Sequence, residues 1–151
     1  MEAVNYSLLA RQAEGLLSGQ RNRISNAANL AALIFQELPD VNWAGFYFEV
    51  GGRLMLGPFQ GKPACVDLPI GSGVCGTAAS TGKVQRVADV HQFDGHIACD
   101  TASESELVVP LFIHGELLGV LDIDSPIRNR FSAEDEQGLS RLAEIYLESI
   151  T

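Results

Sequence analysis

The side chains in this chain with the most reactive chemistry are three cysteines in its middle third, Cys65, Cys75 and Cys99. Glycine, small residues or acids flank each of them, in segments with the composition of loops or loop edges. A buried structural cysteine more often lies within an aliphatic strand or helix, where it acts as a small hydrophobe. We therefore expect thiols that another molecule can reach, and sulfur chemistry is the first hypothesis.

Each cysteine also has a plainer interpretation. Cys65 lies beside Pro63 and Ala64 and is compatible with a buried strand position. Cys75 follows a glycine turn at the start of an expected helix, where the helix dipole would favour a thiolate. We nevertheless favour a small packing residue at that position. Cys99 is compatible with a loop thiol that has no function.

A zinc site formed by the three cysteines and a histidine is a weaker alternative. The sequence has no paired Cys-x-x-Cys element, which is typical of structural zinc sites. The histidines, His91, His96 and His114, fall in expected loops or turns. We therefore predict no metal.

Composition disfavours several classes of partner. The 151 residues are 46% hydrophobic with a formal net charge of -9, which fits one folded domain over residues 1–151. So acidic a chain is not expected to bind the phosphate backbone of nucleic acids or an anionic membrane surface. No signal peptide and no apolar run of roughly 20 residues is apparent. An odd cysteine count without a secretion signal favours the cytoplasm, with thiols free at rest.

Hydrophobic periodicity predicts helices at both ends of the chain and strands between them. Helices are expected over 4–18 and 23–38, after an N-cap at Ser132, and over a short segment, 73–81. Strands are expected over 43–50, 53–59, near Cys65, over 84–90, 106–113 and 116–124. This order predicts an α+β domain with an antiparallel sheet. The terminal helices should cover one face, and the segment 60–105, with all three cysteines, should cover a pocket on the other.

The alternation in the second hairpin predicts which residues face the helices. Odd-numbered positions in both strands are aliphatic, including Leu107, Val109, Leu117, Leu121 and Ile123. We therefore expect them to pack on the terminal helices, and the even-numbered positions to face the pocket.

Three acidic residues fall on the pocket face of this hairpin. A three-residue connection that ends at a left-handed Gly115 places Glu106 directly opposite Asp122, with Asp124 on the same face. Facing like charges destabilise paired strands, so we expect the cluster to serve ligand or proton chemistry. The alternative is that these acids simply begin or end strands at the solvent. Trp43 and Tyr47 in the first strand also have two interpretations. They can be ordinary core residues, or they can form an aromatic surface for the methyl group of a thioether or sulfoxide.

A group of motifs carries a family resemblance over nearly the whole chain. They are NWAGFYF, LGPFQGKPAC, GVCGTA, DVHQFDGHIACD, SESELVVPL and GVLDIDS, in this order and spacing. The chain is similar to the free methionine-(R)-sulfoxide reductases, which are stand-alone GAF-domain enzymes. The resemblance implies a six-stranded antiparallel GAF sheet, no metal or organic cofactor, thioredoxin as electron donor, and a homodimer.

The same resemblance implies a role for each candidate site residue. Cys99 in HIACD matches the catalytic cysteine, Cys65 in GKPAC the resolving cysteine, and Cys75 in GVCG an auxiliary thiol. The acidic cluster for substrate binding and catalysis is matched by Glu106, Asp122 and Asp124. The aromatic residues that line the substrate pocket are matched by Trp43 and Tyr47. Glu106 and Asp124 are the acids that we expect to take part in catalysis.

The implied activity is the reduction of free L-methionine-(R)-S-oxide to L-methionine. The Cys99 thiolate would attack the sulfoxide sulfur, a carboxyl with a raised pKa would protonate the oxygen, and a sulfenic acid would form. Cys65 would then form a disulfide that thioredoxin reduces. The alternative is a GAF sensor module for a small ligand such as a cyclic nucleotide, but such a module needs an output domain and leaves the cysteines unexplained.

Overall fold

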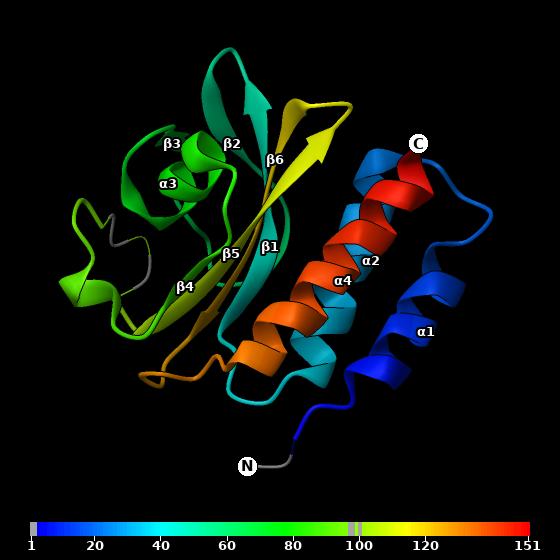
Figure 1. Cartoon of the computed structure of the whole chain (residues 1–151), viewed down its shortest axis with the longest axis horizontal. Coiled ribbons are helices and arrows are strands. Elements are labelled where there is room, and N and C mark those ends of the chain that lie inside the picture. Colours follow the sequence, from blue (N-terminus) through cyan, green and yellow to red (C-terminus); the bar gives the residue numbers. More distant parts are fainter. Residues whose placement is uncertain (1–2, 97–98, 100) are drawn as a thin grey trace.

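The computed structural model describes residues 3–96, 99 and 101–151, and its elements follow the expected order (Figure 1). The helices are α1 (Tyr6–Leu17), α2 (Arg23–Glu37), α3 (Gly73–Thr81) and α4 (Ala133–Ile150), with a short 3-10 turn over Val90–Gln92. The strands are β1 (Trp43–Val50), β2 (Arg53–Gly61), β3 (Asp67–Pro69), β4 (Gln85–Val87), β5 (Ser105–Ile113) and β6 (Glu116–Ser125).

The six strands form one antiparallel sheet in the order β3-β2-β1-β6-β5-β4. Figure 1 shows α1, α2 and α4 together on one side of this sheet and α3 on the other. The predicted α+β architecture is therefore confirmed. Among the described residues, no helix has the length and apolar character that crossing a membrane requires.

Local sequence signals explain where the terminal helices begin. Asn5 and Asn22 cap α1 and α2 by accepting hydrogen bonds from backbone N–H groups of the first turn. Ser132 and Asp135 form a reciprocal capping box at α4, as the predicted N-cap at Ser132 requires. These caps satisfy N–H groups that have no partner within the helix.

The core between the helices and the sheet contains the aliphatic positions that the alternation predicted. Leu107, Leu111, Leu121 and Ile123 are fully buried there and pack with side chains of α1, α2 and α4. A second apolar cluster lies on the opposite face of the sheet, under α3. The sheet therefore has two buried faces, and the second one lines the site.

The tip of the β5–β6 hairpin differs from its predicted geometry. His114 and Gly115 both have positive φ, 51° and 80°, and form a two-residue turn in place of the expected three-residue connection. Phe112 pairs with Leu117 and Leu111 pairs with Gly119, so one residue, Leu118, is extra on β6. This bulge interrupts the alternation along β6, so the residues before it lie on the side opposite to the prediction and the residues after it lie on the predicted side.

Two corrections follow from the bulge. Leu117 packs in the cluster under α3, and Leu118 takes the place on the helix side that was expected for Leu117. Glu106 pairs with Asp124 and not with Asp122, which lies opposite Val108 instead. The register is thus shifted by two residues, and an even shift leaves every acid on the predicted face.

Candidate active site

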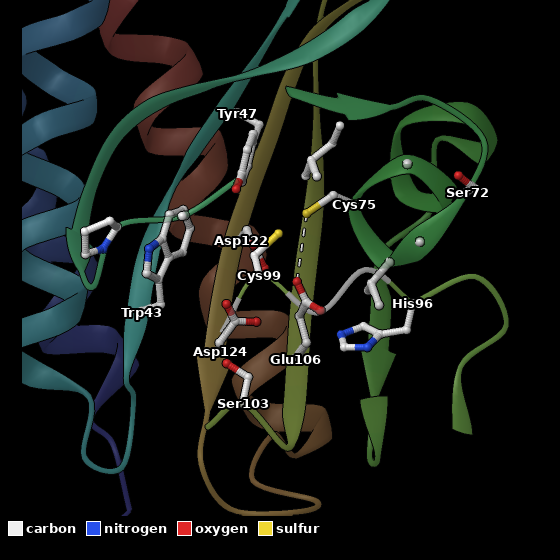
Figure 2. A pocket seen from close by; sticks show the side chains of 16 residues that line it. Trp43, Tyr47, Ser72, Cys75, His96, Cys99, Ser103, Glu106, Asp122 and Asp124 are labelled. Atoms are coloured by element: carbon white, nitrogen blue, oxygen red, sulfur yellow. Dashed lines mark hydrogen bonds between the residues drawn. The ribbon is translucent and has the colours of Figure 1, made fainter. Parts of the chain in front are cut away.

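A pocket lies between the sheet and the segment that contains α3 (Figure 2). Its cavity volume is about 50 Å³. Seven of the eight predicted site residues line it: Trp43, Tyr47, Cys75, Cys99, Glu106, Asp122 and Asp124. The eighth, Cys65, lies just behind the lining residues Pro63 and Ala64. The structure therefore brings residues from β1, β5, β6, α3 and two loops to one place.

The acids come from the two central strands that the hairpin joins. Glu106 and Asp122 are only 7% and 5% exposed, and Asp124 is half-buried. The alternative that Glu106 and Asp122 are strand ends at the solvent is therefore wrong. Among the described residues, Asp122 Oδ1 is buried without a hydrogen-bond partner.

Burial and mutual repulsion set the charge state of this cluster. Burial raises the pKa of Glu106 well above its ordinary value, and the charges of Asp122 and Asp124 raise it further. Burial also raises the pKa of Asp122, although hydrogen bonds with Glu106 and Cys75 act in the opposite direction. Glu106 is therefore the group that we expect to hold a proton, with Asp122 more readily ionised beside it.

Cys75 is a buried thiol within this acidic environment. Its Sγ lies 3.9 Å from Glu106 Oε2 and the residue is 5% exposed. This burial agrees with the packing residue that we favoured at this position, and the general hypothesis of accessible thiols does not hold for Cys75. Burial raises its pKa, and the nearby charges of Asp122 and Glu106 raise it further. The thiol is therefore protonated, and the helix start at α3 does not produce the thiolate that its dipole alone would favour.

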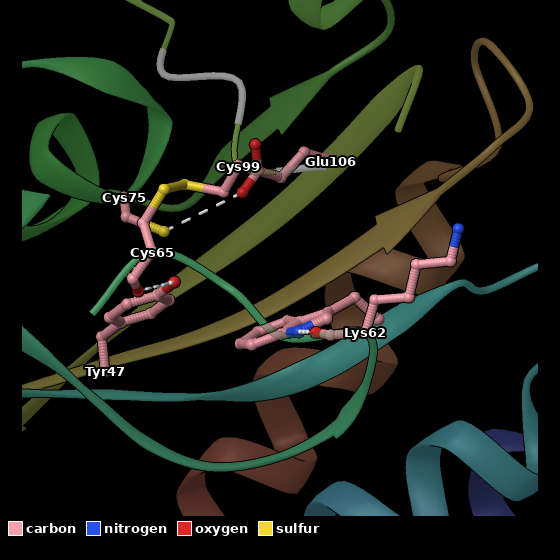
Figure 3. The surroundings of a disulfide bond; sticks show 7 residues. Tyr47, Lys62, Cys65, Cys75, Cys99 and Glu106 are labelled. Carbon is pink, nitrogen blue, oxygen red and sulfur yellow. Dashed lines mark hydrogen bonds between the residues drawn. A yellow bond between two sulfur atoms is a disulfide. The ribbon is translucent and has the colours of Figure 1, made fainter. Parts of the chain in front are cut away.

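Cys65 and Cys99 are joined by a disulfide (Figure 3). Their Cα atoms are 5.4 Å apart across 34 residues of sequence, and both residues are half-buried. The structure is thus an oxidised form, which differs from the expectation of free thiols at rest. In this form the two sulfurs are bonded to each other, so the three-cysteine zinc site does not exist.

The two aromatic residues line the pocket from β1 and are almost completely buried. The Trp43 ring stacks on Phe59, with centroids 5.2 Å apart, and lies 5.8 Å from the Tyr47 ring. Trp43 Nε1 donates a hydrogen bond to the Lys62 carbonyl oxygen at 3.1 Å. The Tyr47 hydroxyl donates one to the Cys65 carbonyl oxygen at 3.0 Å (Figure 3). Each ring therefore lines the pocket, and the polar atom of each side chain bonds to the loop before β3.

Ser103 and His96 also line the pocket, and neither is among the predicted site residues; His96 was considered only as a metal ligand. Ser103 is 6% exposed, and its Oγ accepts a hydrogen bond from Asn42 Nδ2 at 3.2 Å. His96 is half-buried, and burial and the nearby His91 lower its pKa. Their position near Cys99 in the sequence was the only available signal, since neither residue falls in a periodic element.

In the part of the chain that the structure describes, two groups of side chains have the donor atoms that a metal requires. In the pocket, single donor atoms of Cys75, Glu106 and Asp122 lie within 4.8 Å of one another. A metal there would need the thiolate, which the buried acidic surroundings disfavour. The other group is Asp89, His91 and Glu104 on the surface, where His91 Nε2 already lies 2.8 Å from Glu104 Oε2.

Comparison with known proteins identifies the family. The model of the GAF domain matches residues 22–146. The free methionine-R-sulfoxide reductase of Escherichia coli is 53% identical over 91% of this chain and 83% of its own length. The structure of fRMsr of Staphylococcus aureus in its reduced form has a TM-score of 0.97 and 48% identity, and covers 99% of this chain and 97% of that one.

A second structure of the Staphylococcus aureus protein is a complex with substrate. It has a TM-score of 0.96 and 47% identity, and covers 100% of this chain and 99% of that one. Sequence and structure thus agree over almost the full length of the chain. The chain belongs to the GAF domain family and, within it, to the free methionine-R-sulfoxide reductases.

Proposed function

We propose that the protein reduces free L-methionine-(R)-S-oxide to L-methionine, with Cys99 as the attacking thiol. The observation that carries this proposal is the joint placement of Cys99 and the buried acid cluster in one pocket. A thiol that attacks sulfur and a carboxyl that holds a proton are the two groups that sulfoxide reduction requires. The E. coli relative and the substrate-bound S. aureus structure support the assignment.

The first chemical step transfers the sulfoxide oxygen to the enzyme. The Cys99 thiolate attacks the sulfoxide sulfur, and Glu106 or Asp124 supplies the proton that the oxygen takes up. Methionine leaves, and the oxygen remains on Cys99 as a sulfenic acid. The raised pKa of Glu106 suits this task, because the group retains its proton at a pH where an ordinary carboxyl has lost it.

The second step forms the disulfide that the structure contains. The Cys65 thiol attacks the Cys99 sulfenic acid, the sulfur–sulfur bond forms, and the oxygen leaves as water. A dithiol protein of the thioredoxin class then reduces the disulfide by exchange and is itself oxidised. Two electrons enter from the donor and two leave to the substrate, so the reaction requires no metal or organic cofactor.

The charges of the pocket favour a free amino acid as substrate. Asp122 and Asp124, beside a protonated Glu106, attract the ammonium group of free methionine sulfoxide, which a methionine within a peptide lacks. The surfaces of Trp43 and Tyr47 suit the methyl group on sulfur. The same charges would repel the phosphate of a cyclic nucleotide, so the sensor alternative is the less consistent with this site.

The direct test is NADPH consumption in the presence of thioredoxin and thioredoxin reductase. Addition of free methionine-(R)-sulfoxide should start the consumption, and addition of free methionine should not. Absence of turnover with an active thioredoxin system and with dithiothreitol would contradict the proposed activity. We also propose that the protein acts as a cytoplasmic homodimer, which sedimentation and fractionation would test.

A further inference from the structure

We propose that Tyr47 is a positioning residue for disulfide formation, because its hydroxyl holds the backbone of Cys65 where the sulfur can reach Cys99. This inference rests on the proposed roles of the two cysteines. It adds a role for the Tyr47 hydroxyl that the place of the ring in the pocket lining does not explain. The Tyr47 hydroxyl donates its hydrogen bond to the carbonyl oxygen of Cys65 itself (Figure 3).

The segment between β2 and β3 is held to the sheet at three of its carbonyl oxygens. Lys62 accepts from Trp43 Nε1 at 3.1 Å, Cys65 from the Tyr47 hydroxyl at 3.0 Å, and Val66 from the backbone N–H of Leu56 at 2.8 Å. Two of these three donors are side chains of β1, and only the bond from Tyr47 involves Cys65 directly. The position of this cysteine therefore depends on the pocket aromatics.

The donors are themselves held firmly. Tyr47 and Trp43 are 2% and 3% exposed, and the Trp43 ring lies between Tyr47 and Phe59. A Cβ added to Gly61 would come within 2.7 Å of Trp43 Cδ1, so the chain passes against the indole with no space between them. Close packing of this kind leaves the two rings few alternative rotamers.

The hydrogen bond from Tyr47 is independent of the state of the sulfur. Its acceptor is a main-chain oxygen, so the bond can persist when Cys65 is a thiol and when it is part of the disulfide. Burial raises the pKa of the Tyr47 hydroxyl, and the neighbouring acids act in the same direction, so the group remains a donor throughout the cycle. A fixed Cys65 raises the effective concentration of its thiol at Cys99.

The consequence is a separation of two roles within one side chain. The ring of Tyr47 lines the pocket and should matter for the binding of sulfoxide, whereas the hydroxyl should matter for the attack of the Cys65 thiol on the sulfenic acid. Tyr47→Phe removes only the hydroxyl. It should therefore slow the second step, in which the sulfur–sulfur bond forms and water leaves, more than it slows the first.

The test is a single-turnover experiment on the reduced protein with one equivalent of free methionine-(R)-sulfoxide. Methionine is measured in quenched samples, the sulfenic acid is trapped with dimedone, and disulfide formation is followed by the loss of free thiols. The rate of methionine formation in Tyr47→Phe shows how far the substitution affects the first step. Relative to that rate, disulfide formation should be about three- to tenfold slower than in the wild type, as the loss of one hydrogen bond implies, with more trapped sulfenic acid.

A matched control separates positioning from a general loss of stability. The hydroxyl of buried Tyr146 also donates to a backbone carbonyl, that of Arg23 at 2.9 Å, but in the core between the helices and the sheet. Tyr146→Phe should lower thermal stability by a similar amount and leave both steps unchanged. Equal disulfide formation in Tyr47→Phe and wild type would overturn the proposal, as would equal slowing in both variants.

A second measurement does not depend on the sulfoxide reaction. The protein is equilibrated in buffers of reduced and oxidised dithiothreitol. Half of the Cys65–Cys99 disulfide of Tyr47→Phe should be reduced at a ratio of reduced to oxidised dithiothreitol about three- to tenfold lower than in the wild type. An unchanged ratio would overturn the positioning role even if the protein has no reductase activity. Should Tyr47→Phe fail to fold, Trp43→Phe, which removes the bond to Lys62, is measured in the same buffers with the same criteria.

Discussion

Glu106 and Asp124 are direct partners across β5 and β6, so two carboxyl groups face each other on adjacent antiparallel strands. Asp122 lies on the same face, and its charge adds to the repulsion at Glu106. Three full negative charges here would destabilise the sheet. The cluster is therefore expected to share at least one proton, which in the proposed mechanism is transferred to the sulfoxide oxygen.

Amide substitutions in this cluster should reduce activity far more than they reduce stability. Asp122→Asn and Asp124→Asn each remove a charge for the ammonium group, and Glu106→Gln and Asp124→Asn each remove a possible proton donor. We expect activity to fall ~10²–10⁴-fold, with melting temperatures equal to or above the wild type because repulsion is relieved. Steady-state kinetics and thermal melts measure both effects.

Glu116→Gln is the matched control for these variants. Glu116 is an exposed acid at the opposite end of β6. The Glu116→Gln variant should therefore have normal kinetics, and its free energy of unfolding should differ from the wild type by no more than about half a kcal/mol. Near-wild-type turnover in all three pocket variants would contradict both the acidic site and the mechanism derived from it.

The raised pKa of Glu106 makes a signed prediction for stability against pH. The folded state retains this proton above the unfolded value of 4.5, so the folded protein binds more protons than the unfolded chain. The stability from this group is therefore fully present below pH 4.5 and is lost as pH rises toward the folded pKa. Urea unfolding at several pH values should show that the free energy of unfolding of Glu106→Gln rises relative to that of the wild type as pH increases from 4.5. A difference that stays constant with pH would contradict the assignment.

The two bonded cysteines should differ in which part of the cycle they support. Cys99→Ser should abolish turnover because no attacking thiol remains, whereas Cys65→Ser should still form about one methionine per enzyme and then stop with thioredoxin as donor. Methionine yield per enzyme, with and without the donor, distinguishes the two. Substantial turnover by Cys99→Ser would reverse the assigned roles.

Substrate specificity should follow from the charge of the pocket. N-acetyl-methionine sulfoxide and sulfoxide within a peptide lack the ammonium group, and we expect both to be poor substrates compared with the free amino acid. Because the pocket is chiral, only the R epimer at sulfur should be consumed. Chromatography of the remaining epimers gives this result directly, and equal rates on free and N-acetylated substrate would exclude the ammonium from recognition.

The sequence was sufficient to predict the faces of the sheet but not its register. Glu106 and Val108 on β5, and Val120, Asp122 and Asp124 on β6, do lie on the pocket side of the sheet, because the aliphatic residues that alternate with them define the core side. The bulge at Leu118 was not predictable, since Leu117 and Leu118 are equally apolar and either can face the helices. What it requires is Gly119, where a Cβ would overlap the Tyr47 carbonyl oxygen, and a glycine in a strand has several explanations.

The burial of Cys75 and the polar contacts of the aromatics depend on tertiary structure. Cys75 is flanked by small residues because α3 packs closely on the sheet, and the same composition is typical of an accessible loop. The bond from Tyr47 to Cys65 joins residues 18 positions apart through a register shift between β1 and β2. No periodicity in the sequence specifies such a contact.

The bond between Cys65 and Cys99 also determines the order in which the two reactants can react. While the Cys99 sulfur is bonded to Cys65, the thiol that we propose as the attacking group is not available. A second sulfoxide therefore cannot be reduced until the dithiol donor has opened the disulfide, and the two reactants must alternate. Such alternation gives ping-pong kinetics, with parallel double-reciprocal lines at different donor concentrations. When the donor is scarce, the oxidised form should accumulate, and the supply of donor then limits the rate.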